Sequence, residues 1–380
     1  MNIEIKTWDI FCRVIDNYGD IGVCWRLARQ LAREYPFEVR LWVDELDALK
    51  QIWPTAQLCG QQYAEKVDVR LWQDDFPSEI TSADVVIEAF ACNLPESYLI
   101  AMKRRVSQPR WFNLEYLSAE DWVEGCHGLT SVHPQLGLKK TFLFPGVTTK
   151  TAGLLKEKEL LNTSDEFQSN EQTKRVFLQQ FGVQVAPDAL LISLFGYENH
   201  AVASLLEAWM NSPKPIACLV PSGKILPDVS KALSRSLVIG DDVVHGSLQI
   251  HVIPFLNQDN YDRLLWACDI NFVRGEDSFV RAQWAAKPFV WHIYPQDEDF
   301  HMVKLDAFLH RYLNTLDTDT QDSIAELWHQ WNRGEDCAEA WNSCLANLQN
   351  WQKHGQDWRH HLNSLGDLAS NMVHFCQKTL

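Results

Sequence analysis

Two short segments combine carboxylates with a glycine where a predicted strand gives way to a helix. The first, IDNYGDIG (15–22), places Asp16 and Asp20 on either side of Gly19, with Asn17 beside them. A carboxylate near a helix N-terminus is favoured in its ionised form. Either aspartate could therefore accept a proton at neutral pH. The structural alternative is that Asp20 or Asn17 caps the helix, which the sequence predicts to open at Gly22.

The second segment, RGEDSFVRAQ (274–283), combines a glycine, acidic residues and a serine ahead of a predicted helix. Gly275 permits a tight turn. Asp277 and Ser278 could cap the helix, and the N–H groups from Ser278 to Val280 would point outward. Such N–H groups can hold a diphosphate without a P-loop lysine.

Arg274 and Glu276 place opposite charges two residues apart in the same segment. The structural alternative is an exposed Arg274–Glu276 ion pair, which would contribute little to stability. Because the segment directly follows a predicted buried strand, its position favours a functional role.

Two other predicted strand exits carry residues suited to a nucleotide. Phe255 and Gln258 follow one strand, and an aromatic face beside an amide suits a nucleobase. Tyr197 lies in the turn SLFGYEN, where its hydroxyl could donate to a phosphate. Each has a structural alternative, a core position for Phe255 and a plain turn for Tyr197.

The elements that must position these residues alternate between apolar runs and amphipathic segments. Strands are predicted at 8–15, 38–43, 67–71, 84–90 and 110–116, and then at 190–195, 216–220, 248–253, 269–273 and 288–294. Helices are predicted between them, notably at 22–34, 46–53, 95–106, 257–268 and 277–286. This alternation predicts an α/β fold with two parallel sheets. Ligands bind at the carboxyl ends of such strands, so we expect a cleft between two domains.

The predicted domains are an N-terminal Rossmann-like domain at 1–155, a polar linker at 156–180, and a C-terminal Rossmann-like domain at 181–350. A final helix at 351–380 is expected to pack back on the N-terminal domain. The chain reads as helical from about residue 300, and its tryptophans there suit a core better than a ligand platform. Neither domain carries G-x-G-x-x-G, which argues against a nicotinamide cofactor.

The composition narrows the class of protein further. The 380 residues carry a formal charge of −16, which argues against nucleic acid as a partner. No apolar run is long enough to span a membrane, and the N-terminus does not resemble a signal peptide. The ten cysteines include no C-x-x-C pair, which favours reduced thiols and a cytoplasmic location over a zinc site.

Several segments in the same order resemble the EarP family, the bacterial protein-arginine rhamnosyltransferases of elongation factor P. They are IFCRVIDNYGDIGVCWRLARQL, FACNLPE, NLEYLSAE, FPG, LFGYE, IPF, RGEDSFVRAQ and KPFVWHIYPQDE. The resemblance covers nearly the whole chain. The helical C-terminal part and the polar linker match least.

The resemblance implies a GT-B glycosyltransferase architecture, with two Rossmann-like domains facing a central cleft and a helical C-terminal region. It implies inverting transfer of rhamnose from dTDP-β-L-rhamnose to an arginine of elongation factor P, which activates that factor for rescue of ribosomes stalled at polyproline. No cofactor and no metal are expected, and no D-x-D motif suited to a metal-dependent transferase stands out at a predicted strand exit.

The resemblance also implies roles for individual residues. Asp20 corresponds to the general base, with Asp16 beside it, and Arg274 and Glu276 correspond to a catalytic pair. The implied nucleotide-sugar contacts are Asn17, Gly19, Tyr197, Phe255, Gln258, Asp277 and Ser278. Two alternatives stay open, namely a GT-B transferase acting on a small-molecule or lipid-linked acceptor, and a sugar-nucleotide sensor without activity.

Overall fold

The chain folds into two compact units. The computed structural model describes residues 5–15, 18–73 and 76–378. Unit 1 comprises Met1–Lys158 and Leu362–Leu380, and unit 2 comprises Glu159–His361. The expected linker at 156–180 contains two helices, α5 (Leu160–Ser169) and α6 (Glu171–Gln179).

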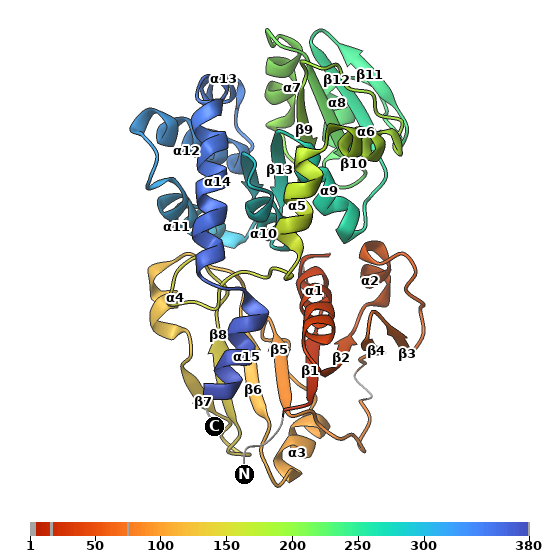
Figure 1. Cartoon of the computed structure of the whole chain (residues 1–380), viewed down its shortest axis with the longest axis vertical. Helices are drawn as coiled ribbons and strands as arrows, with labels where there is room; N and C mark the ends of the chain where they lie inside the picture. Colours follow the sequence, from red (N-terminus) through yellow and green to blue (C-terminus); the bar gives the residue numbers. More distant parts are fainter. Residues whose placement is uncertain (1–4, 16–17, 74–75, 379–380) are drawn as a thin grey trace. The chain divides into compact units, whose positions relative to one another are not determined.

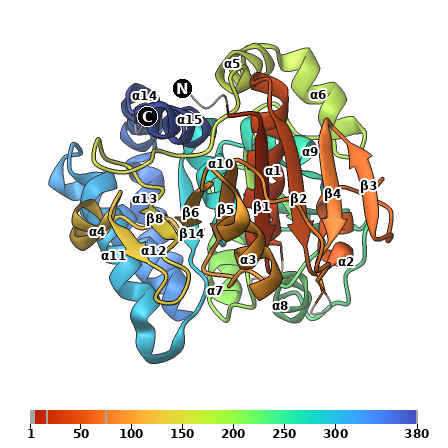
Figure 2. The ribbon, with the colours of Figure 1, turned by 90° about the horizontal axis from the view of Figure 1, so that it is seen from below.

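Unit 1 contains a mostly parallel eight-stranded sheet, whose strand order is β3-β4-β2-β1-β5-β6-β8-β7 (Figure 2). The strands are β1 (Thr7–Cys12), β2 (Glu38–Val43), β3 (Gln61–Ala64), β4 (Val67–Leu71), β5 (Val85–Ala89), β6 (Arg110–Leu114), β7 (Thr130–Val132) and β8 (Lys139–Leu143). Only the edge pairs β3–β4 and β7–β8 are antiparallel among the described pairings. The short strands β3, β7 and β8 were not predicted, because they lack the long apolar runs of the central strands.

Helices cover both faces of this sheet (Figure 1). They are α1 (Gly19–Glu34), α2 (Leu46–Ile52), α3 (Glu96–Arg104), α4 (Asp121–Cys126) and α15 (Leu368–Lys378). On one face Phe11 of β1 packs edge-on against Tyr98 of α3, with ring centroids 4.7 Å apart. Phe375 of α15 packs against Phe112 of β6 at 5.8 Å.

Unit 2 contains a six-stranded sheet in the order β11-β12-β10-β9-β13-β14. Its strands are β9 (Leu190–Leu194), β10 (Ile216–Pro221), β11 (Asp242–His245), β12 (Leu248–Ile253), β13 (Ile270–Arg274) and β14 (Phe289–His292). Every described pairing is parallel except that of β11, the edge strand that the sequence did not predict. Strand β9 therefore lies beside the sequence-distant β13, which in turn lies beside β14.

The helices of unit 2 follow the same alternation and then continue without strands. They are α7 (Val202–Met210), α8 (Leu226–Ala232), α9 (Gln258–Ala267), α10 (Asp277–Ala285), the short 3-10 helix η1 (Asp297–Asp299), α11 (Phe300–Leu313), α12 (Thr318–Arg333), α13 (Ala338–Ala346) and α14 (Leu348–Ser364). Trp328, Trp331, Trp341 and Trp351 are fully buried, which confirms their predicted core role.

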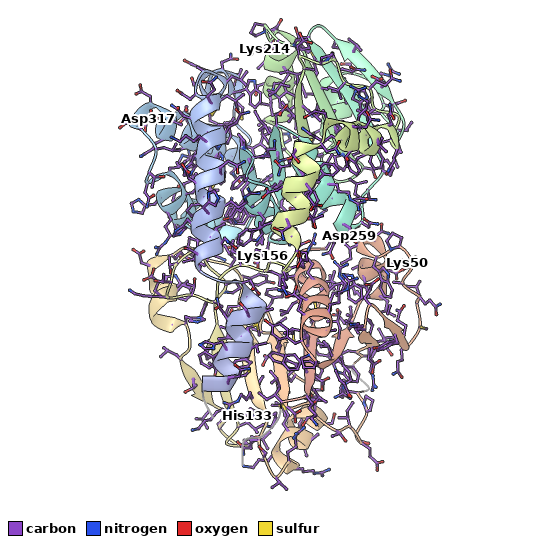
Figure 3. The ribbon with its side chains drawn as sticks, in the orientation of Figure 1. Lys50, His133, Lys156, Lys214, Asp259 and Asp317 are labelled. Atoms are coloured by element: carbon purple, nitrogen blue, oxygen red, sulfur yellow. The ribbon has the colours of Figure 1, made fainter. Side chains whose placement is uncertain are left out.

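The chain returns from unit 2 to unit 1 near the end of α14. Lys156, labelled in Figure 3, donates to Oδ1 of Asn363 at 2.9 Å within unit 1. All ten cysteines are free thiols. In the part of the chain that the structure describes, no helix is long and apolar enough to cross a membrane.

Candidate active site

The candidate base in unit 1 is held by contacts beyond its own helix. Asp20 is 1% exposed. One carboxylate oxygen accepts a hydrogen bond from the Ile15 N–H at 2.7 Å, and the other accepts one from the Tyr116 hydroxyl at 3.1 Å. Tyr116 follows β6 and stacks on Phe90, which follows β5, with ring centroids 4.3 Å apart. Asp20 is therefore fixed by segments that follow β1 and β6.

The predicted helix start at Gly22 is wrong. Helix α1 begins at Gly19, and the Gly22 N–H already donates to the Tyr18 carbonyl at 2.9 Å. Tyr18 occupies the N-cap position without a side-chain cap hydrogen bond, so Asp20 lies in the first helical turn. The structural alternative that Asp20 caps the helix is therefore wrong as well, because Tyr18 is the N-cap residue and the Asp20 carboxylate accepts hydrogen bonds from Ile15 and Tyr116.

Asp16 and Asn17, which the sequence places in the same loop, lie outside the described residues. Their roles stay predictions. Gly19 is half-buried as the first residue of α1, and its role as a sugar contact also stays a prediction.

In unit 2 the RGEDS segment forms a turn pinned by the neighbouring strand β14. Gly275 has a left-handed φ of 62°, which favours glycine. Its N–H donates to the His292 carbonyl at 3.2 Å, and its carbonyl accepts the Trp291 indole N–H at 2.8 Å. Glu276 occupies the N-cap position of α10 without a side-chain cap hydrogen bond.

Asp277 and Ser278, which could cap the helix, do not occupy its N-cap position, and their side chains make other hydrogen bonds. The Ser278 hydroxyl accepts from the Arg274 N–H at 3.1 Å and donates to the Arg274 carbonyl, which closes the turn. Asp277 accepts a hydrogen bond from the Gln258 side chain at 3.0 Å. The Val280 N–H is not available to a diphosphate, since it donates to the Glu276 carbonyl at 3.0 Å. The predicted diphosphate contact from Ser278 to Val280 therefore narrows to the N–H groups of Ser278 and Phe279.

The Arg274 side chain is buried, so the alternative of an exposed pair with Glu276 is wrong. Arg274 is 7% exposed. The guanidinium carbon lies 4.6 Å from the ring centroid of Phe195 and 4.8 Å from that of Tyr197. Its Nη1 is buried without a hydrogen-bond partner among the described residues. A buried cation with an unused donor is suited to an anionic ligand.

The other predicted nucleotide residues gather around the same strand ends. Tyr197, which is 6% exposed, follows β9, and Phe255 follows β12. The Phe255 ring lies 6.1 Å from that of Phe195. Gln258 is the first residue of α9. Unit 2 therefore brings together the residues predicted from its three strand exits, and Arg274 packs against the Tyr197 ring.

Sequence reasoning missed His292 and Trp291, although the segment WHIY lies at a predicted strand exit. His292 ends β14 and is 4% exposed. Burial, together with the positive charges of Arg274 and His301, lowers the pKa of His292 to about 3. Its imidazole is therefore neutral at physiological pH. No group of three or more His, Cys, Asp or Glu side chains suited to a metal occurs among the residues described.

Comparisons with known proteins show the family to which this chain belongs. Residues 8–377 match the family described as "Elongation-Factor P (EF-P) rhamnosyltransferase EarP". The chain belongs to the EarP family. A protein-arginine rhamnosyltransferase of Pseudomonas putida is 50% identical over 98% of this chain and 99% of its own length. One from Neisseria meningitidis is 36% identical over 97% of this chain and 96% of its own.

Solved structures of EarP and of more distant proteins share the fold. A structure of EarP-mediated arginine glycosylation of translation elongation factor EF-P is 37% identical, with a TM-score of 0.70 over 98% of this chain and 99% of that one. MurG of Acinetobacter baumannii, at 12% identity and a TM-score of 0.51 over 99% of this chain and 100% of its own, is similar in fold alone. The EarP family chain has the GT-B glycosyltransferase fold, an α/β fold with two Rossmann-like domains and a helical C-terminal region.

Proposed function

We propose that this protein transfers rhamnose from dTDP-β-L-rhamnose to an arginine side chain of elongation factor P, with inversion at the anomeric carbon. The observation that carries the proposal is membership of the EarP family over residues 8–377. Asp20 and the Arg274–Ser278 turn supply the chemistry that this reaction needs. The modified factor would then relieve ribosomes stalled at polyproline.

The acceptor determines what the base must do. A free guanidinium stays protonated throughout the physiological pH range and is a poor nucleophile in that state. Complete proton transfer to a carboxylate before attack would cost on the order of 13 kcal/mol, since the pKa values differ by roughly ten units. Asp20 therefore holds and polarises the guanidinium and takes its proton as the new C–N bond forms. Glu276, with Asp16, orients the acceptor and balances its charge.

The donor half of the reaction is assigned to unit 2. A guanidinium nitrogen attacks the anomeric carbon while the bond from that carbon to the diphosphate oxygen breaks, so dTDP leaves with the electron pair. Arg274 and the N–H groups at the start of α10 stabilise the developing negative charge. Phe255 and Gln258 hold the nucleobase side. The proposed reaction requires no cofactor and no metal.

Intact-mass analysis of purified elongation factor P, incubated with this protein and dTDP-β-L-rhamnose, tests the proposal. A gain of one deoxyhexose on an arginine is expected. The anomeric configuration of the product, measured by NMR, then tests inversion. Transfer only to a glycan or lipid would contradict the protein acceptor, and nucleotide binding without transfer to any acceptor would support a sensor instead.

A further inference from the structure

His292 bonds to both turns that are assigned to the donor nucleotide. Its Nδ1 accepts the Tyr197 N–H at 3.3 Å, and its carbonyl accepts the Gly275 N–H at 3.2 Å. These bonds connect three strand ends, because Tyr197 follows β9, Gly275 follows β13 and His292 ends β14. In the sheet, His292 is paired directly with Arg274.

The surroundings of the ring hold it in one orientation. The Tyr197 ring lies edge-on to the imidazole at 5.2 Å, and the ring of the buried Trp331 is also edge-on to it, at 5.7 Å. A Cβ added at Gly196 would lie 3.3 Å from Nδ1 and 3.2 Å from the Ile225 side chain. The turn thus approaches the imidazole as closely as glycine allows.

The bond to Tyr197 requires Nδ1 to carry no proton, so the ring hydrogen is assigned to Nε2. The neighbourhood supports this state. Arg274 and His301 are the groups whose positive charge acts on His292, and both disfavour an imidazolium there. The Nδ1 of His301 accepts the Gln296 N–H at 3.2 Å and so has its own backbone partner.

We propose that His292 is a positioning residue for the donor. It holds the 196–197 turn and the 274–275 turn in one fixed arrangement, so that Tyr197 and Arg274 are already placed when the nucleotide diphosphate binds. This role rests on the proposed function of unit 2 as the nucleotide-sugar half. The competing explanation is that His292 only fills space against the Trp331 ring.

Three substitutions separate an acceptor role from a packing role. In His292→Asn, Oδ1 can occupy the place of Nδ1 and accept the Tyr197 N–H. In His292→Gln, the amide reaches the place of Nε2 instead, and in His292→Phe the volume is kept without any acceptor. A positioning role predicts that Asn preserves function best, whereas a packing role predicts that Phe does.

The measurements are the Kd of dTDP by calorimetry and the steady-state constants for both substrates. We expect the Kd of dTDP and the KM of dTDP-rhamnose to rise about tenfold or more in His292→Phe and His292→Gln, because a buried N–H loses its acceptor. The KM for elongation factor P should stay near its original value, and His292→Asn should remain within a few-fold of the original protein in all constants.

His251→Phe is the matched control, since His251 is also a buried histidine on a strand of the same sheet, at 3% exposed. It should lower stability without changing the Kd of dTDP. Equal affinities in all three His292 variants, or better function in Phe than in Asn, would overturn the positioning role.

The design also separates this inference from the proposed function. If the original protein binds dTDP but does not modify elongation factor P, the proposed acceptor is wrong. The Kd of dTDP for the three His292 variants, measured by calorimetry, still tests the positioning role. If it binds no dTDP, both proposals are overturned.

Discussion

Asp20 combines near-complete burial with two hydrogen-bond donors, the Ile15 N–H and the Tyr116 hydroxyl. Each carboxylate oxygen accepts one of these two hydrogen bonds. A side chain held in this way loses little freedom when it meets a cationic acceptor. The structural contacts and the proposed role as a base are therefore compatible in one residue.

Replacement of Asp20 by asparagine should remove proton acceptance while keeping the side-chain shape. We expect the transfer rate to fall on the order of 10²- to 10⁴-fold, with dTDP affinity and fold retained. Intact-mass time courses measure the rate, and calorimetry measures affinity. Asp47→Asn is the control, since Asp47 is an exposed aspartate in the first turn of α2 of the same unit. A rate near the original would remove Asp20 from catalysis.

His292 should also affect stability in acid. Its pKa is lowered to about 3, first by burial and then by Arg274 and His301. Below about pH 6.5 the unfolded chain protonates this histidine and the folded chain does not, so stability falls as pH falls. In His292→Asn, the slope of unfolding free energy between pH 6.5 and 4 should decrease by up to one proton, or about 1.4 kcal/mol per pH unit. Urea unfolding at several pH values measures it, and an unchanged slope would contradict the neutral state.

Gln258 of α9 donates a hydrogen bond to Asp277 of α10. A buried ion pair also connects the two helices. Arg281 of α10 bonds to Asp262 of α9 through two parallel hydrogen bonds of 2.9 and 2.7 Å. The side chains are 2% and 7% exposed. The ion pair fixes the two helices relative to one another, and thereby the contact between Gln258 and Asp277.

Removing one partner of this pair should be costly. In Arg281→Met the Asp262 carboxylate stays buried without its partner, so we expect about 3–5 kcal/mol of destabilisation. Urea unfolding measures it. Arg263→Met, on the exposed side of α9, should change stability by about 0.5 kcal/mol or less. Equal effects of the two substitutions would show that the pair contributes nothing specific.

At the scale of the whole chain, unit 1 is completed by the C-terminal residues Leu362–Leu380. Gln30 of α1 donates to Asp367 at 3.1 Å, and Asn371 donates to the Ala152 carbonyl at 3.0 Å. The side chains of Leu368, Met372 and Cys376 are about 1% exposed. Unit 1 therefore depends on residues that lie more than 200 positions further along the chain than the rest of the unit.

Deletion of residues 362–380 should destabilise unit 1 selectively. Burial of the apolar side chains of α15 contributes on the order of 5 kcal/mol, which is a large share of the stability of a domain. Limited proteolysis should then cleave within 5–158 first, while 159–361 stays protected. His374→Ala, at an exposed position of α15, is the control and should leave the cleavage pattern unchanged. Simultaneous cleavage of both units would contradict a selective effect.

The central strands could be predicted from the sequence, since apolar runs bounded by glycine and polar turns are a local pattern. β2 and β4 occupy the ranges predicted, 38–43 and 67–71. The same local signal located the strand exits that carry Asp20, Tyr197, Gln258 and Arg274. Short edge strands and the true start of α1 at Gly19 lacked such a signal.

Which side chains meet at those exits depends on the tertiary structure. The Tyr116 hydroxyl reaches Asp20 across 96 positions, and the Tyr197 N–H reaches His292 across 95. These contacts follow from the order of strands in each sheet, which brings distant segments side by side. The burial of Arg274 over two aromatic rings has the same origin, because it depends on β9 lying next to β13. Local pattern places a residue at a strand end, and the sheet order determines its partners.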